Sequence, residues 1–297
     1  MAMTSNAVIR QENFKVYLCM AALTMTLGVL GTVLSYYFHW GLTGTGMFLL
    51  LSAAINFYSY YFSHKLILKM SGAKLLQREQ LPELFDMVEG LCAGQELPVP
   101  RLFLINDASM NAFATGRDRN HSVVAVTRGL LEKLEMDEVR GVVAHEIGHI
   151  QNGDMRLMTI VTMAAGFISI LADMYWYSMR ASRADERDRS GALAMIGFAL
   201  SVLAPISALL IQLAISRKRE FVADALSAQM TRNPGGLADA LEKIKHDMRP
   251  LPSAGVTMAH LYFSNPFKQG DIIDKLFSTH PPVEERVHNL RQMKGGM

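Results

Sequence analysis

Four long apolar runs divide this chain, and polar segments separate them. The first two runs extend from Val16 to Phe38 and from Met47 to about Phe62; the other two extend from Leu157 to about Met179 and from Ala192 to about Ile215. A helix needs about 20 mainly apolar residues to cross a bilayer. The pattern therefore predicts four transmembrane helices, arranged as two hairpins.

The charges around the first hairpin predict its orientation. Arg10 and Lys15 precede the first run, and Lys65, Lys69 and Lys74 follow the second, whereas the link between the runs, residues 40–46, contains no cation. Cytoplasmic flanks carry an excess of lysine and arginine, so we expect this hairpin to start and finish in the cytoplasm. Aromatic side chains gather near the run ends, as in the aromatic belts of membrane proteins: Tyr36, Tyr37, Trp40, Tyr60 and Tyr61.

The second pair of runs fits a membrane hairpin less well. Its link, residues 180–189, holds four arginines, and Asp173 lies inside the third run. Arginines on the outer side depart from the positive-inside rule, and a carboxylate facing lipid is costly. The alternative is that this pair is buried in protein or lies partly across the bilayer.

Two polar segments remain, and they predict an α+β domain in two parts. The predicted boundaries are a cytoplasmic N-terminus over residues 1–15, a hairpin over 16–63, a first domain part over 64–154, a second hairpin over 155–215 and a second domain part over 216–297. Periodicity predicts strands at residues 101–105, 111–115 and 122–126, and helices at 82–94, from 130 onward, 217–230, 237–246, 271–277 and 283–293. Residues 249–270 are predicted to form a loop.

Composition supports a membrane protein and excludes some partners. The chain is 50% hydrophobic and only 19% charged, where soluble domains average about 25% charged residues. A net charge of +2 without a basic stripe argues against nucleic acid binding. Cys19 and Cys92 form neither a metal-ligand motif nor a redox motif, so no disulfide framework is expected.

Chemistry enters with the sequence His145-Glu146-Ile147-Gly148-His149. Apolar residues around it recur at helical spacing, and on a helix the two histidines, at i and i+4, share one face and reach one Zn²⁺ ion. Glu146 then lies where it takes a proton from water bound at the metal. The alternative is two ordinary histidines beside a glutamate.

A catalytic zinc usually has three protein ligands and one open position, so a further ligand is needed. Glu220 is the candidate, because Glu220 and Asp224 are i and i+4 on a predicted helix and share a face. Asp224 is expected to accept a hydrogen bond from the outer nitrogen of a ligand histidine. The alternative makes both acids ion-pair partners of the neighbouring Arg217, Lys218 and Arg219. If Glu220 and His149 meet, the segment between them crosses the membrane an even number of times, in agreement with a second hairpin.

Taken together, these motifs resemble those of the HtpX family of bacterial membrane metalloproteases, which is related to the CAAX prenyl-protein endopeptidases. The resemblance rests on the paired N-terminal runs and on four motifs in order: residues 111–114, 145–149, 220–224 and 278–282. It implies a mainly α membrane protein with a gluzincin-type zinc endopeptidase domain. It further implies one Zn²⁺ per chain, an active site on the cytoplasmic side of the inner membrane, and quality control of misfolded or damaged membrane proteins under stress.

The resemblance also suggests residues that act beside the metal. His280 and Arg286 are candidates for stabilising the oxyanion; the alternatives are a loop histidine before prolines and a surface arginine on a helix. Substrate is expected to add as a strand along residues 111–115, because backbone pairing tolerates many sequences. The residues named for that contact are Asn111, Ala112, Phe113 and Ala114, although Asn111 as a simple strand or turn residue is nearly as good an interpretation.

Two other functions fit the same motifs. A membrane scaffold would bind zinc without turnover, and a processing enzyme of the CAAX prenyl-protease kind would cut one short motif. That second fold normally has more spans than the four counted here. The partners expected for the preferred function are membrane protein substrates, the lipid bilayer and other quality-control proteases of the membrane.

Overall fold

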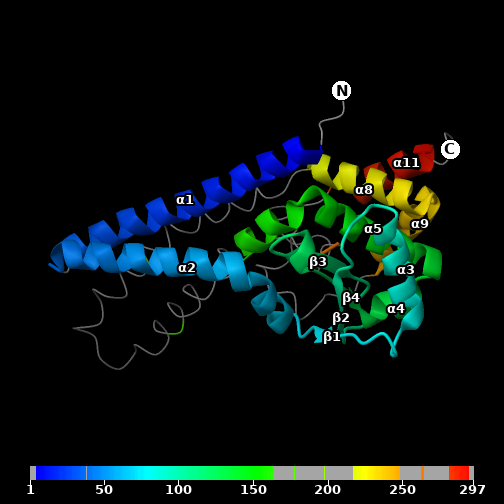
Figure 1. Ribbon diagram of the computed structural model, residues 1–297, viewed down its shortest axis with the longest axis horizontal. Helices are drawn as coiled ribbons and strands as arrows, with labels where there is room; N and C mark the ends of the chain where they lie inside the picture. Colours follow the sequence, from blue (N-terminus) through cyan, green and yellow to red (C-terminus); the bar gives the residue numbers. More distant parts are fainter. Residues whose placement is uncertain are drawn as a thin grey trace.

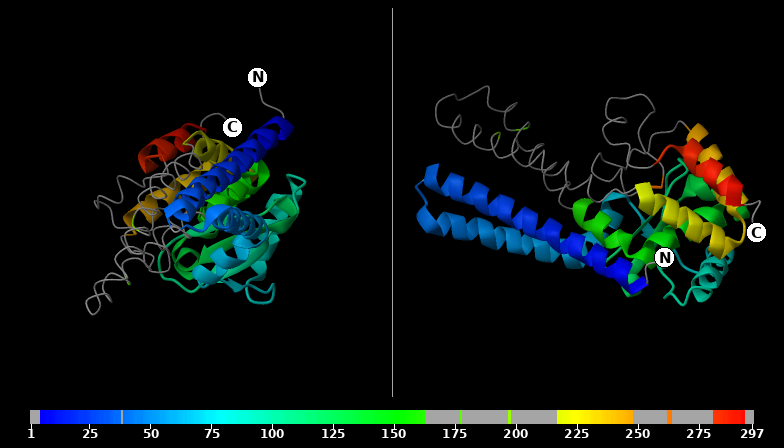
Figure 2. Two further views of the ribbon diagram at one scale, coloured as in Figure 1. Left: turned by 90° about the vertical axis from the view of Figure 1, so that its left-hand side faces the viewer. Right: turned by 90° about the horizontal axis from the view of Figure 1, so that it is seen from above.

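The computed structural model describes residues 5–37, 39–162, 177, 197, 217–247, 262–263 and 281–293. Two long helices project together from one side of a region of helices and strands (Figure 1). Seen from above, the hairpin and the α+β region form one elongated body (Figure 2). The described chain thus consists of two regions, the helical hairpin and the α+β region.

The projecting hairpin consists of α1 (Ser5–Tyr37) and α2 (Gly41–Met70). Both helices are longer than the apolar runs that predicted them, and the predicted link was wrong in extent, because residues 41–46 already belong to α2. Glycines let the two helices approach closely: a Cβ atom on Gly31 would lie 2.3 Å from the Cβ of Phe48. The tight turn at His39, with φ of 56°, completes the reversal of the chain.

The hairpin has small and polar side chains inside and apolar side chains outside. Ser52 is fully buried and Asn56 is 8% exposed, whereas Leu42 and Leu50 are 90% and 74% exposed. The Asn56 side chain donates a hydrogen bond of 2.7 Å to the Thr24 hydroxyl on the other helix. Among the described residues, the stretch Asn13–Val33 and the helix Gly41–Met70 are long and apolar enough to cross a membrane.

The later pair of predicted spans lies almost entirely outside the described residues. Residues 154–162 are helical and include the start of the third run. Asp173 and the arginine-rich link of residues 180–189 lie outside the described part, and so do the predicted loop over most of 249–270 and the predicted helix at 271–277. The crossing of the membrane by the second pair therefore stays a prediction.

The α+β region contains a four-stranded mixed sheet in the order β1-β2-β4-β3. Its strands are β1 (Lys74–Leu75), β2 (Arg101–Ile105), β3 (Ala112–Gly116) and β4 (Ser122–Thr127). β2 runs parallel to β4, and the other neighbours are antiparallel. Three strands were predicted within one residue of their bounds; β1, with two exposed residues, shows no alternation and was missed.

Both faces of the sheet are covered, which explains why the strands are nearly continuous apolar runs. On one face, Ala112, Val124 and Val126 pack with Val143 and Ile147 in the main hydrophobic core. On the other face lies a second core, to which the last turns of α2 contribute: Ile67, Leu68, Ile105, Phe113, Val123, Ala125, Met158 and Tyr262. The second apolar helix thus continues without a break from the hairpin into the layer beneath the sheet.

The remaining helices build the rest of the α+β region. They are α3 (Pro82–Ala93), α4 (Arg128–Lys133), α5 (Met136–Asn152), α8 (Arg217–Thr231), α9 (Pro234–His246) and α11 (Val283–Met293). The helix predicted from residue 130 onward is two helices, because the chain is extended at Leu134 and Glu135. The gap between the helices predicted at 217–230 and 237–246 is shorter than expected, because α8 ends at Thr231, Asn233 caps α9 and Pro234 begins it.

Candidate metal centre

Helix α5 carries the motif of two histidines and a glutamate. At its start the Glu138 carboxylate accepts a hydrogen bond of 2.8 Å from the backbone N–H of Glu135, which satisfies one of the free donors of a helix N-terminus. At its end Gly153 takes a left-handed conformation with φ of 79°. The middle of the helix is buried, so both histidines and Glu146 lie in the interior rather than at the surface.

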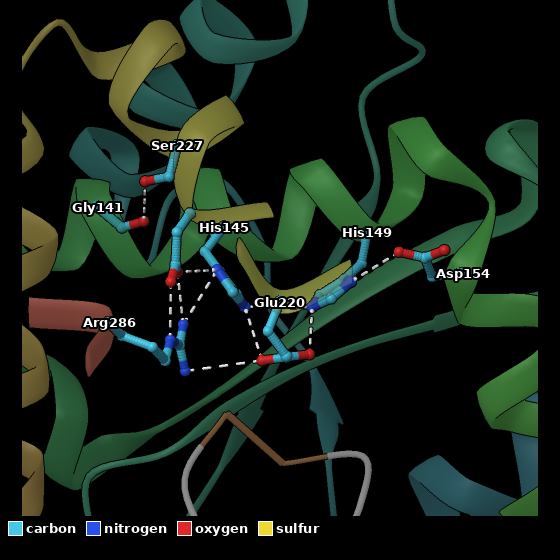
Figure 3. A network of polar contacts seen from close by, with 8 residues as sticks. Gly141, His145, His149, Asp154, Glu220, Ser227 and Arg286 are labelled. Atoms are coloured by element: carbon cyan, nitrogen blue, oxygen red, sulfur yellow. Dashed lines mark hydrogen bonds and ion pairs between the residues drawn. The ribbon is translucent and has the colours of Figure 1, made fainter. Parts of the chain in front are cut away.

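Three side chains from two helices converge on one point (Figure 3). His145 and His149 come from α5, and Glu220 comes from the first turn of α8. The Nε2 atoms of the histidines are 3.1 Å apart, and the Glu220 carboxylate oxygens lie 3.8 Å from Nε2 of His145 and 3.5 Å from Nε2 of His149. All three ligand atoms lie within 4.8 Å of one another, so one metal ion can contact all of them.

Close packing of α5 and α8 brings these ligands together. The Ser227 hydroxyl on α8 donates a hydrogen bond of 2.7 Å to the Gly141 carbonyl on α5. Further along α5, a Cβ atom on Gly148 would lie 3.3 Å from the Cα of Ala223, which is closer than an ordinary van der Waals contact. A small residue between the histidines therefore lets α8 approach closely enough to place Glu220 beside them.

Each ligand histidine is also held by an aspartate on its outer nitrogen. Nδ1 of His145 lies 2.9 Å from Oδ1 of Asp224, and Nδ1 of His149 lies 3.2 Å from Oδ2 of Asp154. Such carboxylates fix the tautomer and the ring orientation of a ligating histidine, so that Nε2 faces the metal. The Asp224 contact was expected from the sequence, whereas Asp154 was missed as a functional residue.

An arginine stands behind each of these aspartates. Nη2 and Nε of Arg286 lie 2.6 Å and 2.9 Å from the two carboxylate oxygens of Asp224, and Nη1 lies 3.6 Å from Glu220. Nη1 of Arg219 lies 3.7 Å from Asp154. Arg286 is only 1% exposed, so the alternative of a surface arginine is wrong. Its bidentate contact offsets the charge of the buried acids.

The surroundings set the protonation of these groups. Burial lowers the pKa of His145 to about 4, although Asp224 partly offsets that effect. Burial acts in the same direction on His149, but the carboxylates of Asp154, Glu220 and Glu146 outweigh it and raise its pKa to about 9. Burial acts to raise the pKa of Asp224, but the charge of Arg286 and the hydrogen bond with His145 hold it at about 2.

The predicted substrate strand is already partly paired. The backbone N–H of Phe263 donates a hydrogen bond of 2.8 Å to the carbonyl of Ala112 at the edge of the sheet. The Phe263 ring lies 5.1 Å from the His145 ring, and the guanidinium of Arg286 lies 5.1 Å from the ring of Phe263. Any peptide that pairs with Ala112 therefore has to displace Phe263, which the sequence did not suggest.

Other predicted site residues are placed as follows. Asn111 is buried just before β3, where its side chain accepts a hydrogen bond of 3.0 Å from the N–H of Ala112. Phe113 points to the opposite side of the sheet and packs against Tyr262, with ring centroids 5.2 Å apart. Ala114 lies in the main core with Ala112. His280 lies outside the described residues, so its role stays a prediction.

Two imidazoles and one carboxylate around one point, with a further carboxylate on the turn between the histidines, define the site of a metal-dependent hydrolase. Comparison with known proteins shows to which family of metal-dependent hydrolases the chain belongs. The model of the family described as Peptidase family M48 matches residues 78–294. The chain belongs to this family, and it is a membrane-associated metalloprotease.

Proteins described as "Protease HtpX homolog" are similar over most of the chain. The protein from Dictyoglomus turgidum is 44% identical over 86% of this chain and 84% of its own. The protein from Thermococcus sibiricus is 41% identical over 94% of each chain. The crystal structure of S. mikatae Ste24p is 18% identical and superimposes with a TM-score of 0.50, covering 96% of this chain and 66% of that one. That similarity concerns the fold alone.

Proposed function

We propose that this protein is a zinc endopeptidase of the bacterial cytoplasmic membrane that hydrolyses misfolded or damaged membrane proteins during stress. The observation that carries the proposal is the convergence of His145, His149 and Glu220 within 4.8 Å, beside a hairpin whose outer surface is apolar. The multi-pass arrangement and the cytoplasmic position of the site follow from the charge pattern and are part of the proposal.

The donor set suits zinc. A tetrahedral ion with Zn–N bonds of about 2.0–2.1 Å holds its ligand atoms roughly 3.3 Å apart, and the separations of 3.1, 3.5 and 3.8 Å are close to that value. Bound by two imidazoles and a single carboxylate, the ion would keep a fourth position open for water, as in other catalytic zinc sites. We propose one ion per chain.

The residues divide the work of peptide hydrolysis. When bound, the metal supplies Lewis acidity to water and to the scissile carbonyl. Glu146 accepts the proton of the attacking water and delivers it to the leaving amine. Asp224 and Asp154 keep the two imidazoles oriented, and Arg286 keeps Asp224 ionised. A donor to the developing oxyanion is also needed, and His280 and Arg286 remain the proposed residues.

We propose that substrate pairs with the edge of β3 at Ala112 and Ala114, whose backbone groups face the same way because alternate residues do in a strand. Pairing through backbone atoms is insensitive to sequence, as a degradative protease requires. Asn111 positions this edge by holding the N–H of Ala112. Substrate and Phe263 therefore compete for one carbonyl.

The test separates metal binding from catalysis. The variant Glu146→Gln should keep its metal, measured by elemental analysis of purified protein, and lose cleavage of an unfolded membrane protein by a factor on the order of 10²–10⁴. The variant His145→Ala should lose both metal and cleavage. Full proteolysis by the first variant overturns the role of Glu146. Stoichiometric metal in the native chain without hydrolysis favours the scaffold instead.

Two further measurements separate the remaining alternatives. Sequencing of the cleavage products distinguishes a broad degrader from a processing enzyme, which would release a single fragment. Topology reporters fused at Ser182 and at Met297 locate the ends of the second pair of runs. A cytoplasmic signal at Met297 with an external signal at Ser182 supports the proposed four spans, and cytoplasmic signals at both positions favour a pair that stays on one side.

A further inference from the structure

A cavity of about 250 Å³ lies where the hairpin meets the α+β region. Asn13 from α1 lines it together with Arg117, Arg119 and Arg156 from the α+β region. Its volume is just below the roughly 300 Å³ at which pockets for drug-sized ligands begin. A cavity of this size accommodates a small polar group rather than a whole lipid or a peptide.

The charge of the lining is strongly positive. Three arginines and a single acid, Asp118, are among the residues that line it. Nε of Arg117 lies 3.0 Å from Oδ2 of Asp118, and the other oxygen of the same carboxylate contacts Nδ1 of His121 at 2.7 Å. Asp118 pairs with Arg117 and also contacts His121, so this one carboxylate offsets only part of the positive charge of the three arginines. A planar guanidinium binds phosphate through two parallel hydrogen bonds, so clustered arginines favour a phosphate-bearing ligand.

The position of the cavity identifies the source of that phosphate. Asn13 is the first residue of the apolar stretch that can cross a membrane, and its side chain accepts a hydrogen bond of 2.8 Å from Arg156. The guanidiniums of Arg117 and Arg156 lie 5.3 Å and 5.6 Å from the rings of Tyr61 and Tyr60 on α2. Tyrosines of this kind lie at the level of lipid headgroups, so the cavity opens at the membrane surface.

We infer that this cavity binds the headgroup of an anionic phospholipid, with Arg117 and Arg156 as phosphate ligands. The inference rests on the membrane placement proposed above. Basic pockets beside transmembrane helices on the cytoplasmic side are suited to such headgroups. The guanidinium groups lie against aromatic rings, which orients them for a ligand in the cavity.

The cavity also borders the metal centre. Gly153, which ends α5, is part of the lining, and the next residue, Asp154, holds Nδ1 of His149 at 3.2 Å. Arg119 donates a hydrogen bond to the carbonyl of Gln151 in the last turn of α5. A headgroup in the cavity therefore contacts the segment that orients one metal ligand, and lipid binding is expected to stabilise that segment.

Thermal unfolding in detergent tests the inference. Measurements use the full chain with Glu146→Gln, so that self-cleavage and turnover do not contribute. Added phosphatidylglycerol should raise Tm by about 5 °C near saturation, and phosphatidylcholine should raise it far less. The additional substitution Arg117→Gln should abolish most of this rise, and Arg117→Lys should retain part of it, because lysine keeps the charge without the planar fork.

Two further variants keep the test independent of folding. Arg128→Gln removes an exposed arginine elsewhere on the domain, paired with Glu132, and should leave the lipid effect intact. Asn120→Asp adds a carboxylate at an exposed position of the lining and removes no arginine contact, so it should weaken the effect even if Arg117→Gln fails to fold. Native mass spectrometry should show bound phosphatidylglycerol that is lost in Asn120→Asp and retained in Arg128→Gln.

Three outcomes overturn the inference. Equal shifts in Asn120→Asp and Arg128→Gln would mean that the lipid acts elsewhere. Equal shifts with both lipids would remove the requirement for negative charge. The same shift from sodium phosphate at matched ionic strength would mean that the cavity takes free phosphate rather than a headgroup. A failure of the membrane placement is recognised separately, because the chain would then fractionate as a water-soluble protein without detergent.

Discussion

Serine and asparagine side chains are buried in the helical hairpin while leucines face outward, and the α+β region has the reverse arrangement. In the hairpin Ser52 is fully buried and Leu50 is 74% exposed, whereas Leu130 and Ile147 in the α+β region are both fully buried. Water drives apolar side chains inward, but helices in lipid associate through small residues and interhelical hydrogen bonds. The hairpin therefore has the side-chain distribution expected in lipid, and the α+β region has the distribution expected in water.

The α+β region makes one large exception, which is the metal centre. Seven charged or ionisable side chains are buried there: His145, Glu146, His149, Asp154, Glu220, Asp224 and Arg286. Burial of charge is costly unless each group is paired, and here bidentate and histidine–aspartate contacts provide the pairing. In the middle section of the hairpin, in contrast, the buried polar side chains, such as Ser52 and Asn56, carry no charge. Charge is thus concentrated where the chemistry needs it.

The largest expected effect comes from removing the buried cation of this cluster. Arg286→Met leaves Asp224 and Glu220 without their cation and should lower the free energy of unfolding by about 3–5 kcal/mol. The matched control is Arg291→Met on the same helix, because Arg291 pairs with Asp239 and Glu242 at the surface, where such pairs contribute about 0–1 kcal/mol. Denaturant unfolding in detergent measures both. Equal losses would mean that burial of the ion pair is unimportant.

A second prediction tests whether lipid surrounds the hairpin. Met25 is 71% exposed in the middle of the first apolar stretch. Met25→Asp should disfavour membrane insertion by about 3 kcal/mol, which alkaline extraction of membranes detects as released protein. Met136→Asp is the control, since Met136 is 45% exposed at the start of α5, where an acid is tolerated. If both variants stay in the membrane fraction equally well, the hairpin is not in lipid.

Glycine positions sharpen the comparison on a smaller scale. A Cβ atom on Gly141 would lie 2.7 Å from the backbone nitrogen of Leu237, whereas one on Gly46 would meet nothing within 4 Å. Gly141→Ala should push α9 away from α5 and destabilise the protein by about 1–3 kcal/mol. Gly46→Ala should be neutral or stabilise α2 by about 0.5–1 kcal/mol. The measurement is the difference in Tm between the two variants. A Tm of Gly46→Ala below that of Gly141→Ala would contradict the close packing of α5 against α9.

The smallest effect concerns a thiol. Burial raises the pKa of Cys92 to about 11, so the group stays protonated as the pH rises through the range in which a free cysteine ionises. Maleimide labelling of a Cys19→Ser variant at pH 8 should therefore be slower than that of a free thiol by on the order of 100-fold. Denaturant should restore fast labelling. Rapid labelling of the folded protein would show that this part of the core opens readily.

Much of the fold and most of the metal centre were predictable from sequence, for identifiable reasons. The spacing of His145 and His149 fixes their common face once the helix is recognised, and the need for another ligand led to Glu220. Asp154 was missed because its contact with His149 depends on the left-handed turn at Gly153, which spacing rules for helices do not describe. The contact of Arg286 with Asp224 joins residues 62 positions apart and depends on how α11 packs.

The edge of the sheet shows a different limit. Periodicity predicted a strand at residues 111–115, and this strand was expected to pair with substrate. Periodicity alone does not show whether another segment of the chain already pairs with that strand. The hydrogen bond from Phe263 to Ala112 joins two segments about 150 residues apart. Pairings of this kind follow from the folded arrangement as a whole, and no local pattern in the sequence marks them.

Helix α2 runs without interruption from Gly41 to Met70, and its last turns are built into the core beneath the sheet. From Tyr61 to Met70 such a helix rises about 13 Å. In the proposed arrangement it acts as a rigid stalk that holds the metal centre at a constant height above the bilayer surface. In that arrangement, peptide bonds at that height would be the first to be cut. The length of the stalk would then select the cleavage point along an anchored chain even where the site itself recognises no sequence.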